Sequence, residues 1–139
     1  MQDKQVWMCE GLLCEKGNIE EIPLVTVKGE QKHMKVVFGL QKIPQNYYFS
    51  NIFLDNTNYH RIHSPVRGTI TRIERCPGIL VFLRPWFYRK WPSFPALNNE
   101  RINVDILDTA KRKWHLSIVA GPGVGGIEMN KHVGHTVST

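Results

Sequence analysis

Long apolar runs are missing from this sequence of 139 residues, because no stretch approaches the roughly 18 apolar residues that a membrane-spanning helix needs. The N-terminal residues, Met-Gln-Asp-Lys-Gln, contain neither an apolar signal region nor an amphipathic segment rich in arginine and serine. Cysteine is scarce as well: Cys9, Cys14 and Cys76 are too few, and odd in number, for a disulfide framework. These absences favour a reducing compartment over a secreted disulfide-rich domain.

Ligand spacings typical of zinc sites are absent too. Four residues separate Cys9 from Cys14, two separate His132 from His135, and Cys76 stands alone. Neither spacing suits zinc, so we expect buried thiols and surface histidines in place of a metal site.

A glycine-rich segment at residues 121–126, Gly-Pro-Gly-Val-Gly-Gly, formally matches the G-x-G-x-x-G pattern of dinucleotide-binding proteins. A nucleotide site of this kind also needs a helix directly after the glycines and an acidic residue about 20 positions later. Neither follows in this sequence. We therefore expect the segment to form a turn or to pack closely against another part of the backbone.

The sequence is moderately basic, with a net charge of +6 and an isoelectric point of about 9.4. This balance suits an anionic partner such as nucleic acid or acidic lipid, and it equally suits a basic compartment such as the mitochondrion. The composition, with 42% hydrophobic and 22% charged residues, is ordinary for a globular protein. A chain of this length can bury one hydrophobic core, so we expect a single domain over residues 1–139.

Apolar residues recur with the period of strands, and no window of about 11 residues has a helical stripe. Strands are predicted over residues 6–13, 22–28, 34–38, 47–54, 69–73, 79–83, 102–107 and 114–120. Turns are predicted at residues 16–18, 55–58 and 77–78, and residues 108–113 are expected to connect the last two strands. The pattern predicts an all-β fold, either a curved sandwich or an open barrel.

One segment, residues 84–95, interrupts this rhythm with three prolines, five aromatic residues and three basic residues. The prolines exclude most of it from a strand ladder, so we expect a long loop. Its aromatic and basic side chains suit the interface of an anionic membrane, a protein–protein contact, or simple packing over the mouth of the barrel. The candidate contact residues are Trp86, Tyr88, Arg89, Lys90 and Trp91.

The strongest concentration of proton-transfer chemistry lies at residues 59–63, Tyr-His-Arg-Ile-His. His60 and His63 would face opposite sides of a strand but would share a side in a turn, and the polar residues on either side favour a turn. Because imidazole titrates near neutral pH, such a pair can divide the roles of base and charge stabiliser. The alternative is that both histidines form hydrogen bonds with the local backbone.

The motifs around this pair follow the order found in the phosphatidylserine decarboxylase family, which the chain resembles over roughly residues 6–135. The matching motifs are Val-Lys-Gly at 27–29, Tyr-His-Arg-Ile-His at 59–63, Pro-Val-Arg-Gly at 65–68, Cys-Pro-Gly at 76–78, Asn-Glu-Arg at 99–101 and Val-Gly-Gly-Ile at 124–127. Each motif is weak alone, and their common order carries the resemblance. It implies the all-β core of that family.

The resemblance also implies a chemistry. Enzymes of this family use an Asp-His-Ser arrangement to cleave their own chain at a Gly-Ser-Thr motif, and the new terminal serine becomes a pyruvoyl group that serves as electron sink for loss of CO₂. His63 matches the base of that arrangement, and His60 matches the companion histidine implicated in decarboxylation. Glu10 matches the aspartate, with a side chain one methylene longer, and glutamate orients the histidine in some other triads.

One family motif is not found. The 139 residues contain no Gly-Ser-Thr, and Ser138-Thr139 follow a valine and lie too close to Gly126 for the family's spacing. The resemblance then implies that the chain as given holds no pyruvoyl cofactor and cannot decarboxylate a substrate alone.

Three functions remain open. The first is a catalytically inactive family member that serves as a structural or accessory subunit of a larger assembly, in the mitochondrion and at its inner membrane, or alternatively in the cytoplasm. The second is the β-chain-like part of an active decarboxylase that converts phosphatidylserine to phosphatidylethanolamine with a separate pyruvoyl-bearing chain. The third is a module that binds anionic lipid or, less favoured, nucleic acid. The missing Gly-Ser-Thr and the change to Glu10 favour the first function, whereas retention of both histidines favours the second.

Overall fold

The computed structural model describes residues 4–19, 24–27, 30–42, 44–55, 57–78, 99–121 and 126–139. In chain order the elements are β1 (Leu12–Asn18), β2 (Leu24–Val27), β3 (Glu30–His33), α1 (Met34–Phe38), β4 (Tyr48–Phe53), β5 (Gly68–Cys76), β6 (Arg101–Asp108), β7 (Lys113–Val119) and β8 (Thr136–Val137). Within these ranges, no helix has the length and apolar character needed to cross a membrane.

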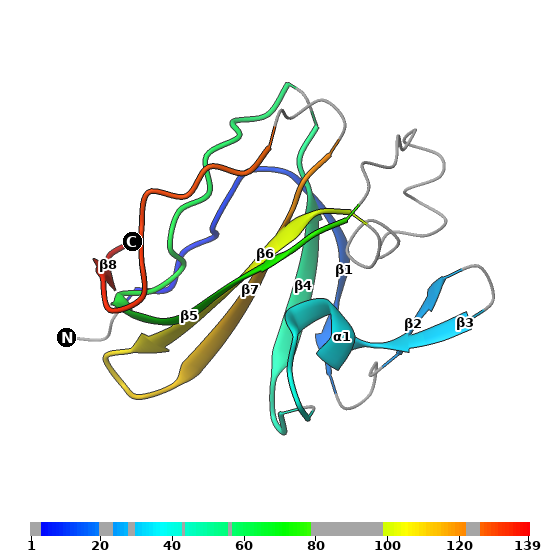
Figure 1. The fold of residues 1–139 in the computed structure, drawn as a ribbon, viewed down its shortest axis with the longest axis horizontal. Coiled ribbons are helices and arrows are strands. Elements are labelled where there is room, and N and C mark those ends of the chain that lie inside the picture. The colour runs from blue at the N-terminus through cyan, green and yellow to red at the C-terminus, as the bar shows by residue number, and fades with distance from the viewer. Residues whose placement is uncertain are drawn as a thin grey trace.

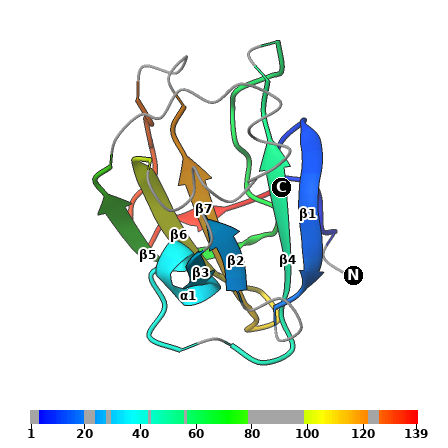
Figure 2. The same cartoon turned by 90° about the vertical axis from the view of Figure 1, so that its right-hand side faces the viewer.

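The strands form three antiparallel sheets, with the orders β7-β6-β5-β8, β1-β4 and β2-β3 (Figure 1). Figure 2 shows β5, β6 and β7 followed by the β1–β4 pair around a curve that outlines half a barrel, with α1 and the β2–β3 hairpin in front. The described part of the chain contains only five α-helical residues, those of α1. The prediction of a curved or open all-β fold is confirmed.

The main hydrophobic core lies on one face of the four-stranded sheet. It consists of Val66, Ile70, Ile102, Val104, Ile106 and Leu116. In β6 the apolar members alternate with Asn103 and Asp105, whose side chains therefore lie on the opposite face. The sheet thus has one apolar face and one polar face.

A register shift in β5 assigns its residues to these two faces. Ile70 pairs with Ile106, whereas Arg72, two residues later, pairs with Asp105, the direct neighbour of Ile106. Without the shift, Ile70 and Arg72 would point to the same face, because side chains alternate along a strand. The irregularity lets Ile70 enter the core while Arg72 reaches the polar face.

A second apolar cluster joins α1 to the β1–β4 pair. Ile19 and Val37 are buried there, and Phe38, Tyr47 and Phe49 pack against them. The short helix is therefore fixed by tertiary contacts, since an isolated helix of this length would not be stable in water.

Most predicted strands are confirmed. The predictions at 22–28, 47–54, 69–73, 102–107 and 114–120 correspond to β2, β4, β5, β6 and β7. Residues 109–112 connect β6 to β7, within the connection predicted at 108–113, and neither β3 nor β8 was predicted. The predicted strand at 79–83 and the predicted loop at 84–95 lie outside the described residues.

Two predictions near the N-terminus are wrong. The strand expected at 6–13 begins only at Leu12, and the turn expected at 16–18 is the last part of β1. The reason is pairing with β4, in which Lys16 lies opposite Ser50 and Asn18 lies opposite Tyr48. Cross-strand pairing outweighs the turn preference of the local Gly-Asn sequence.

The segment Met34–Phe38 was also predicted wrongly, as a strand, because it forms α1. Gly39 directly follows it with a φ of 63°, the left-handed conformation that commonly ends a helix. Two arginines from the sheet bind the helix carbonyls, as described below. These partners are distant in sequence, so the local pattern could not reveal the helix.

Replacing Gly39 with alanine is expected to lower the free energy of unfolding by at least about 1 kcal/mol, because alanine is strained at positive φ. The new methyl group would also press against the Glu74 carboxylate and lie 3.1 Å from Nη1 of Arg72. Urea denaturation measures the loss, and Gly121→Ala is the matched control, because no atom lies within 4 Å of a methyl group there. Equal stability of the two variants would contradict this role of Gly39.

Candidate functional site

His60 and His63 lie in a segment without regular secondary structure, directly after a turn closed by the hydrogen bond from Asn58 N–H to Asp55 C=O (2.8 Å). Both side chains are exposed. The backbone N–H of His63 donates to the carbonyl of Met8 (2.9 Å), so the N-terminal segment runs beside the histidines.

The ring of His60 is held by the local backbone. Its Nδ1 lies 2.7 Å from the carbonyl oxygen of Asn58, and a carbonyl only accepts hydrogen bonds. Nδ1 therefore carries the hydrogen, and Nε2 of the neutral ring keeps its lone pair. His60 thus presents a proton acceptor on the protein surface.

The ring of His63 is held by Tyr59. The two rings stack with centroids 5.7 Å apart and an angle of 8° between planes. Nε2 of His63 lies 3.3 Å from the Tyr59 hydroxyl, which is a long hydrogen bond. The first residue of the Tyr-His-Arg-Ile-His motif therefore orients the last.

Glu10 does not join this pair. It lies two residues after Met8, so its chain segment is close to that of His63, but its exposed carboxylate forms no hydrogen bond or ion pair with either histidine in the described part of the chain. Of the two triad positions that the family motif implies in this chain, Glu10 and His63, the side chains are thus not joined by a hydrogen bond among the described residues. The candidate contact residues Trp86, Tyr88, Arg89, Lys90 and Trp91 lie outside the described residues.

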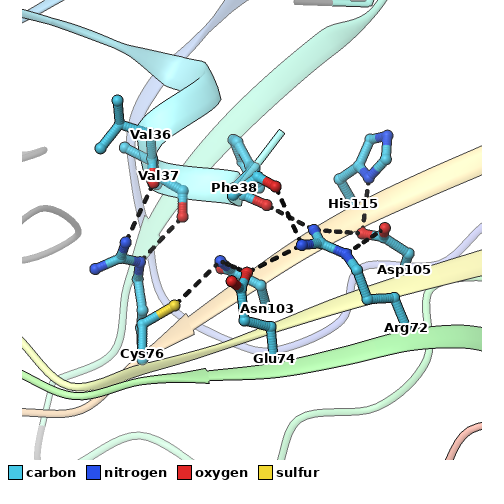
Figure 3. Close-up of polar contacts among 11 residues, drawn as sticks. Val36, Val37, Phe38, Arg72, Glu74, Cys76, Asn103, Asp105 and His115 are labelled. Atoms are coloured by element: carbon cyan, nitrogen blue, oxygen red, sulfur yellow. Dashed lines mark hydrogen bonds and ion pairs between the residues drawn. The ribbon is translucent and has the colours of Figure 1, made fainter. Parts of the chain in front are cut away.

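The sequence did not reveal a second cluster of ionisable groups on the polar face of the sheet (Figure 3). Arg72 of β5 binds Asp105 of β6 through Nε (2.7 Å) and Nη2 (3.2 Å), and Nδ1 of His115 from β7 lies 2.8 Å from the same carboxylate. The three side chains form one row across the strands, because the register places Asp105 opposite both Arg72 and His115. The alternating polar residues Asn103 and Asp105 indicate a polar face of β6, but the sequence does not show which residues of the neighbouring strands lie opposite them.

This row also anchors α1. Nη2 and Nη1 of Arg72 donate to the carbonyls of Phe38 (2.7 Å) and Gly39 (3.1 Å). Arg101, the last residue of the Asn-Glu-Arg motif, donates to the carbonyls of Val37 (3.0 Å) and Val36 (3.1 Å) (Figure 3). The end of a helix leaves carbonyls without intrahelical partners, and the two guanidinium groups satisfy them here. The cluster is therefore part of the structural framework.

Two carboxylates of β6 have lowered pKa values. Burial alone would raise the pKa of Asp105, but hydrogen bonds and charges from Arg72 and His115 outweigh it and hold this pKa below its ordinary value. Burial of Asp108 is outweighed in the same way by hydrogen bonds from Trp114 and Arg112, so its pKa is lowered as well. Both groups are therefore stabilised in the charged form.

Acid is expected to destabilise the fold through these carboxylates. A group with a lower pKa in the folded than in the unfolded state contributes stability above its unfolded pKa of about 3.9, and loses it as pH falls through the folded pKa. We expect the free energy of unfolding, measured in urea, to decrease below about pH 4, and to decrease less steeply in Asp105→Asn and Asp108→Asn. Equal slopes in the wild type and both variants would contradict the assignment.

Comparisons with known proteins agree with the family resemblance of the sequence. The family model described as phosphatidylserine decarboxylase matches residues 2–139. The phosphatidylserine decarboxylase proenzyme of Shewanella amazonensis is 30% identical over 131 residues, which cover 91% of this chain and 45% of that protein. The corresponding proenzyme of Polaromonas naphthalenivorans is 31% identical over 122 residues, covering 85% of this chain and 42% of that protein. The chain thus spans less than half the length of these relatives.

Proposed function

Because the chain belongs to the phosphatidylserine decarboxylase family, we propose that it forms the histidine-bearing part of an enzyme that decarboxylates phosphatidylserine. The rest of that enzyme, including the source of its pyruvoyl group, would come from outside these 139 residues. The observation that carries this proposal is the exposure of both motif histidines, each with an oriented ring.

The two motif histidines differ from a histidine with a structural role. His115 shows what such a role looks like in this protein, because its ring is mostly buried and holds Asp105 in the sheet network. In the described part of the chain, the hydrogen bonds and ring contacts of His60 and His63 are instead made with residues of their own segment, and both side chains are exposed. An exposed imidazole whose ring is held in one orientation can exchange a proton with a bound group.

The residues present fit the cofactor that the family implies. When bound, a pyruvoyl group supplies the electron sink for loss of CO₂. Nε2 of His60, with its free lone pair, can accept a proton or a hydrogen bond from a bound group, and His63 can exchange a proton with the Tyr59 hydroxyl. In this proposal Glu10 orients the ring of His63 only if its carboxylate approaches that ring in the complete enzyme.

A second candidate function is a non-catalytic subunit of a larger assembly. It is supported by the position of Glu10, whose carboxylate does not contact His63 in the described chain. A histidine without an orienting carboxylate is a weaker base than one that has it. In this alternative the partners are other protein subunits, and the basic net charge agrees with a mitochondrial location.

The release of CO₂ from phosphatidylserine distinguishes the two functions. The complete protein that contains these residues should be isolated with its bound partners and given phosphatidylserine labelled in the serine carboxyl group. Release of labelled CO₂ is the result expected from the proposal. If the preparation is folded and inactive while it migrates with a large complex, the non-catalytic alternative replaces it.

A further inference from the structure

The turn directly before the histidine motif holds Asn58 through both its backbone and its side chain. The Asn58 N–H donates to the carbonyl of Asp55 (2.8 Å), and Oδ1 of Asn58 accepts from the N–H of the same residue (2.8 Å). Asparagine suits this position because its short amide side chain can bind nearby backbone groups. Asn58 is half-buried, whereas its neighbours Thr57 and Tyr59 are exposed. The two hydrogen bonds therefore fix the backbone of Asn58, including its carbonyl group.

This carbonyl selects one tautomer of the His60 ring. Because Nδ1 of His60 lies 2.7 Å from the carbonyl oxygen, the opposite tautomer would bring two lone pairs together at hydrogen-bond distance. Within the described part of the chain, this is the only hydrogen bond of the His60 side chain. Nε2 lies on the far side of the ring from the carbonyl, so its lone pair is directed away from Asn58.

His135 has the opposite arrangement. The backbone N–H of His132 donates to Nδ1 of His135 (3.3 Å), so in the neutral ring Nδ1 has the lone pair and Nε2 carries the hydrogen. Both His60 and His135 are exposed, and each ring binds a backbone group two or three residues earlier. The tautomer of an exposed histidine in this protein thus depends on the backbone group that its Nδ1 meets.

The histidine segment is also fixed on the other side of His60. The His63 N–H donates to the carbonyl of Met8 (2.9 Å). The Ser64 hydroxyl donates to the carbonyl of Val66 (2.6 Å), whose side chain lies in the main hydrophobic core. With the backbone held after His60, the turn that ends at Asn58 determines how the His60 ring is bound.

We propose that Asn58 is a positioning residue that holds His60 in the tautomer with the hydrogen on Nδ1 and so presents the Nε2 lone pair to a bound group. Asn58 acts through its carbonyl and needs no contact with that group. A side chain that accepts a proton must offer a lone pair at the reacting nitrogen, and the opposite tautomer would offer an N–H there. This inference rests on the proposed function for the role of His60 in the reaction, but not for its tautomer.

¹⁵N NMR of the complete protein that contains these residues, with labelled histidine, measures the tautomers at alkaline pH, where imidazole is neutral. In the wild type we expect the hydrogen on Nδ1 of His60 and on Nε2 of His135. The variant Asn58→Ala loses the Oδ1 acceptor that closes the turn, so the His60 ring should sample both tautomers. The ¹⁵N shifts of its two nitrogens should then move towards each other, while those of His135 stay unchanged.

Two further variants are controls. Thr57→Ala removes an exposed side chain from the same turn, and Asn58→Asp keeps an oxygen that can accept from the Asp55 N–H. Both should keep the wild-type tautomer and the wild-type rate of CO₂ release from phosphatidylserine. In Asn58→Ala we expect this rate to fall about 10-fold to 100-fold, because a misplacement of about 1 Å in a reacting group can cost about 100-fold.

The proposal is overturned if the wild-type spectrum places the His60 hydrogen on Nε2, or if Asn58→Ala leaves the tautomer unchanged. Equal changes in Asn58→Ala and Thr57→Ala would also overturn it, since the effect would then not come from the Asn58 side chain. An Asn58→Ala enzyme with altered tautomers and the wild-type rate refutes the positioning role. A wild-type protein that has the expected tautomers but releases no CO₂ refutes the proposed function and leaves the tautomer assignment intact.

Discussion

The variant His63→Ala is expected to release CO₂ from phosphatidylserine at least about 100-fold more slowly than the wild type, measured in the complete protein. A side chain that transfers protons in catalysis contributes about 10²–10⁴ in rate, and His63 is the motif histidine that Tyr59 orients by stacking and by a hydrogen bond. The same substitution should hardly change the stability of the fold, because the side chain is exposed and lies outside both hydrophobic clusters.

The matched control for this experiment is His132→Ala. His132 is also exposed and also lies beside an aromatic ring, that of His135, but it is not part of the Tyr-His-Arg-Ile-His motif. We expect its activity to equal that of the wild type. If both variants keep full activity, His63 takes no part in catalysis, and if both lose it equally, the effect does not come from the motif.

Replacing Asp105 with alanine is expected to lower the free energy of unfolding by about 3 kcal/mol. Removal of one partner from a buried ion pair costs about 3–5 kcal/mol, and the low end applies because the Asp105 side chain is 16% exposed and the Arg72 side chain 31% exposed. The substitution also removes a hydrogen-bond partner of His115 and weakens the binding of Arg72 to the carbonyls of Phe38 and Gly39 at the end of α1.

Urea denaturation measures this loss, with Glu128→Ala as the control, because Glu128 is an exposed carboxylate. Exposed charges contribute little to stability, so we expect the control to change the free energy of unfolding by less than about 0.5 kcal/mol. A loss of similar size in both variants would show that the row of Arg72, Asp105 and His115 does not hold α1 to the sheet.

The sequence was sufficient where a local pattern determines the structure. The strand predicted at 102–107 corresponds to β6, in which Ile102 and Val104 lie in the hydrophobic core and alternate with the polar Asn103 and Asp105. The histidine pair was also found from the sequence, because the two residues lie three positions apart in a motif that belongs to an ordered series.

The sequence was insufficient where distant partners decide. α1 ends at carbonyls bound by Arg72 and Arg101, which lie more than 30 positions further along the chain. The turn-like residues 16–18 extend as a strand because β4 pairs with them. The row of Arg72, Asp105 and His115 depends on the pairing register of β5, β6 and β7, which includes the shift in β5. No local pattern in the sequence determines that register.

The central claim is that the 139 residues of this chain work together with a pyruvoyl-bearing chain. Chemical identification of the N-terminus of each copurifying chain tests this claim most directly. A pyruvoyl terminus has no free amine, so it resists stepwise N-terminal sequencing, and reductive amination with ammonia converts it to alanine. We predict that the complete protein contains a chain that is blocked before this treatment and yields N-terminal alanine after it. If every copurifying chain has an ordinary terminus and no alanine appears after reductive amination, the claim is contradicted.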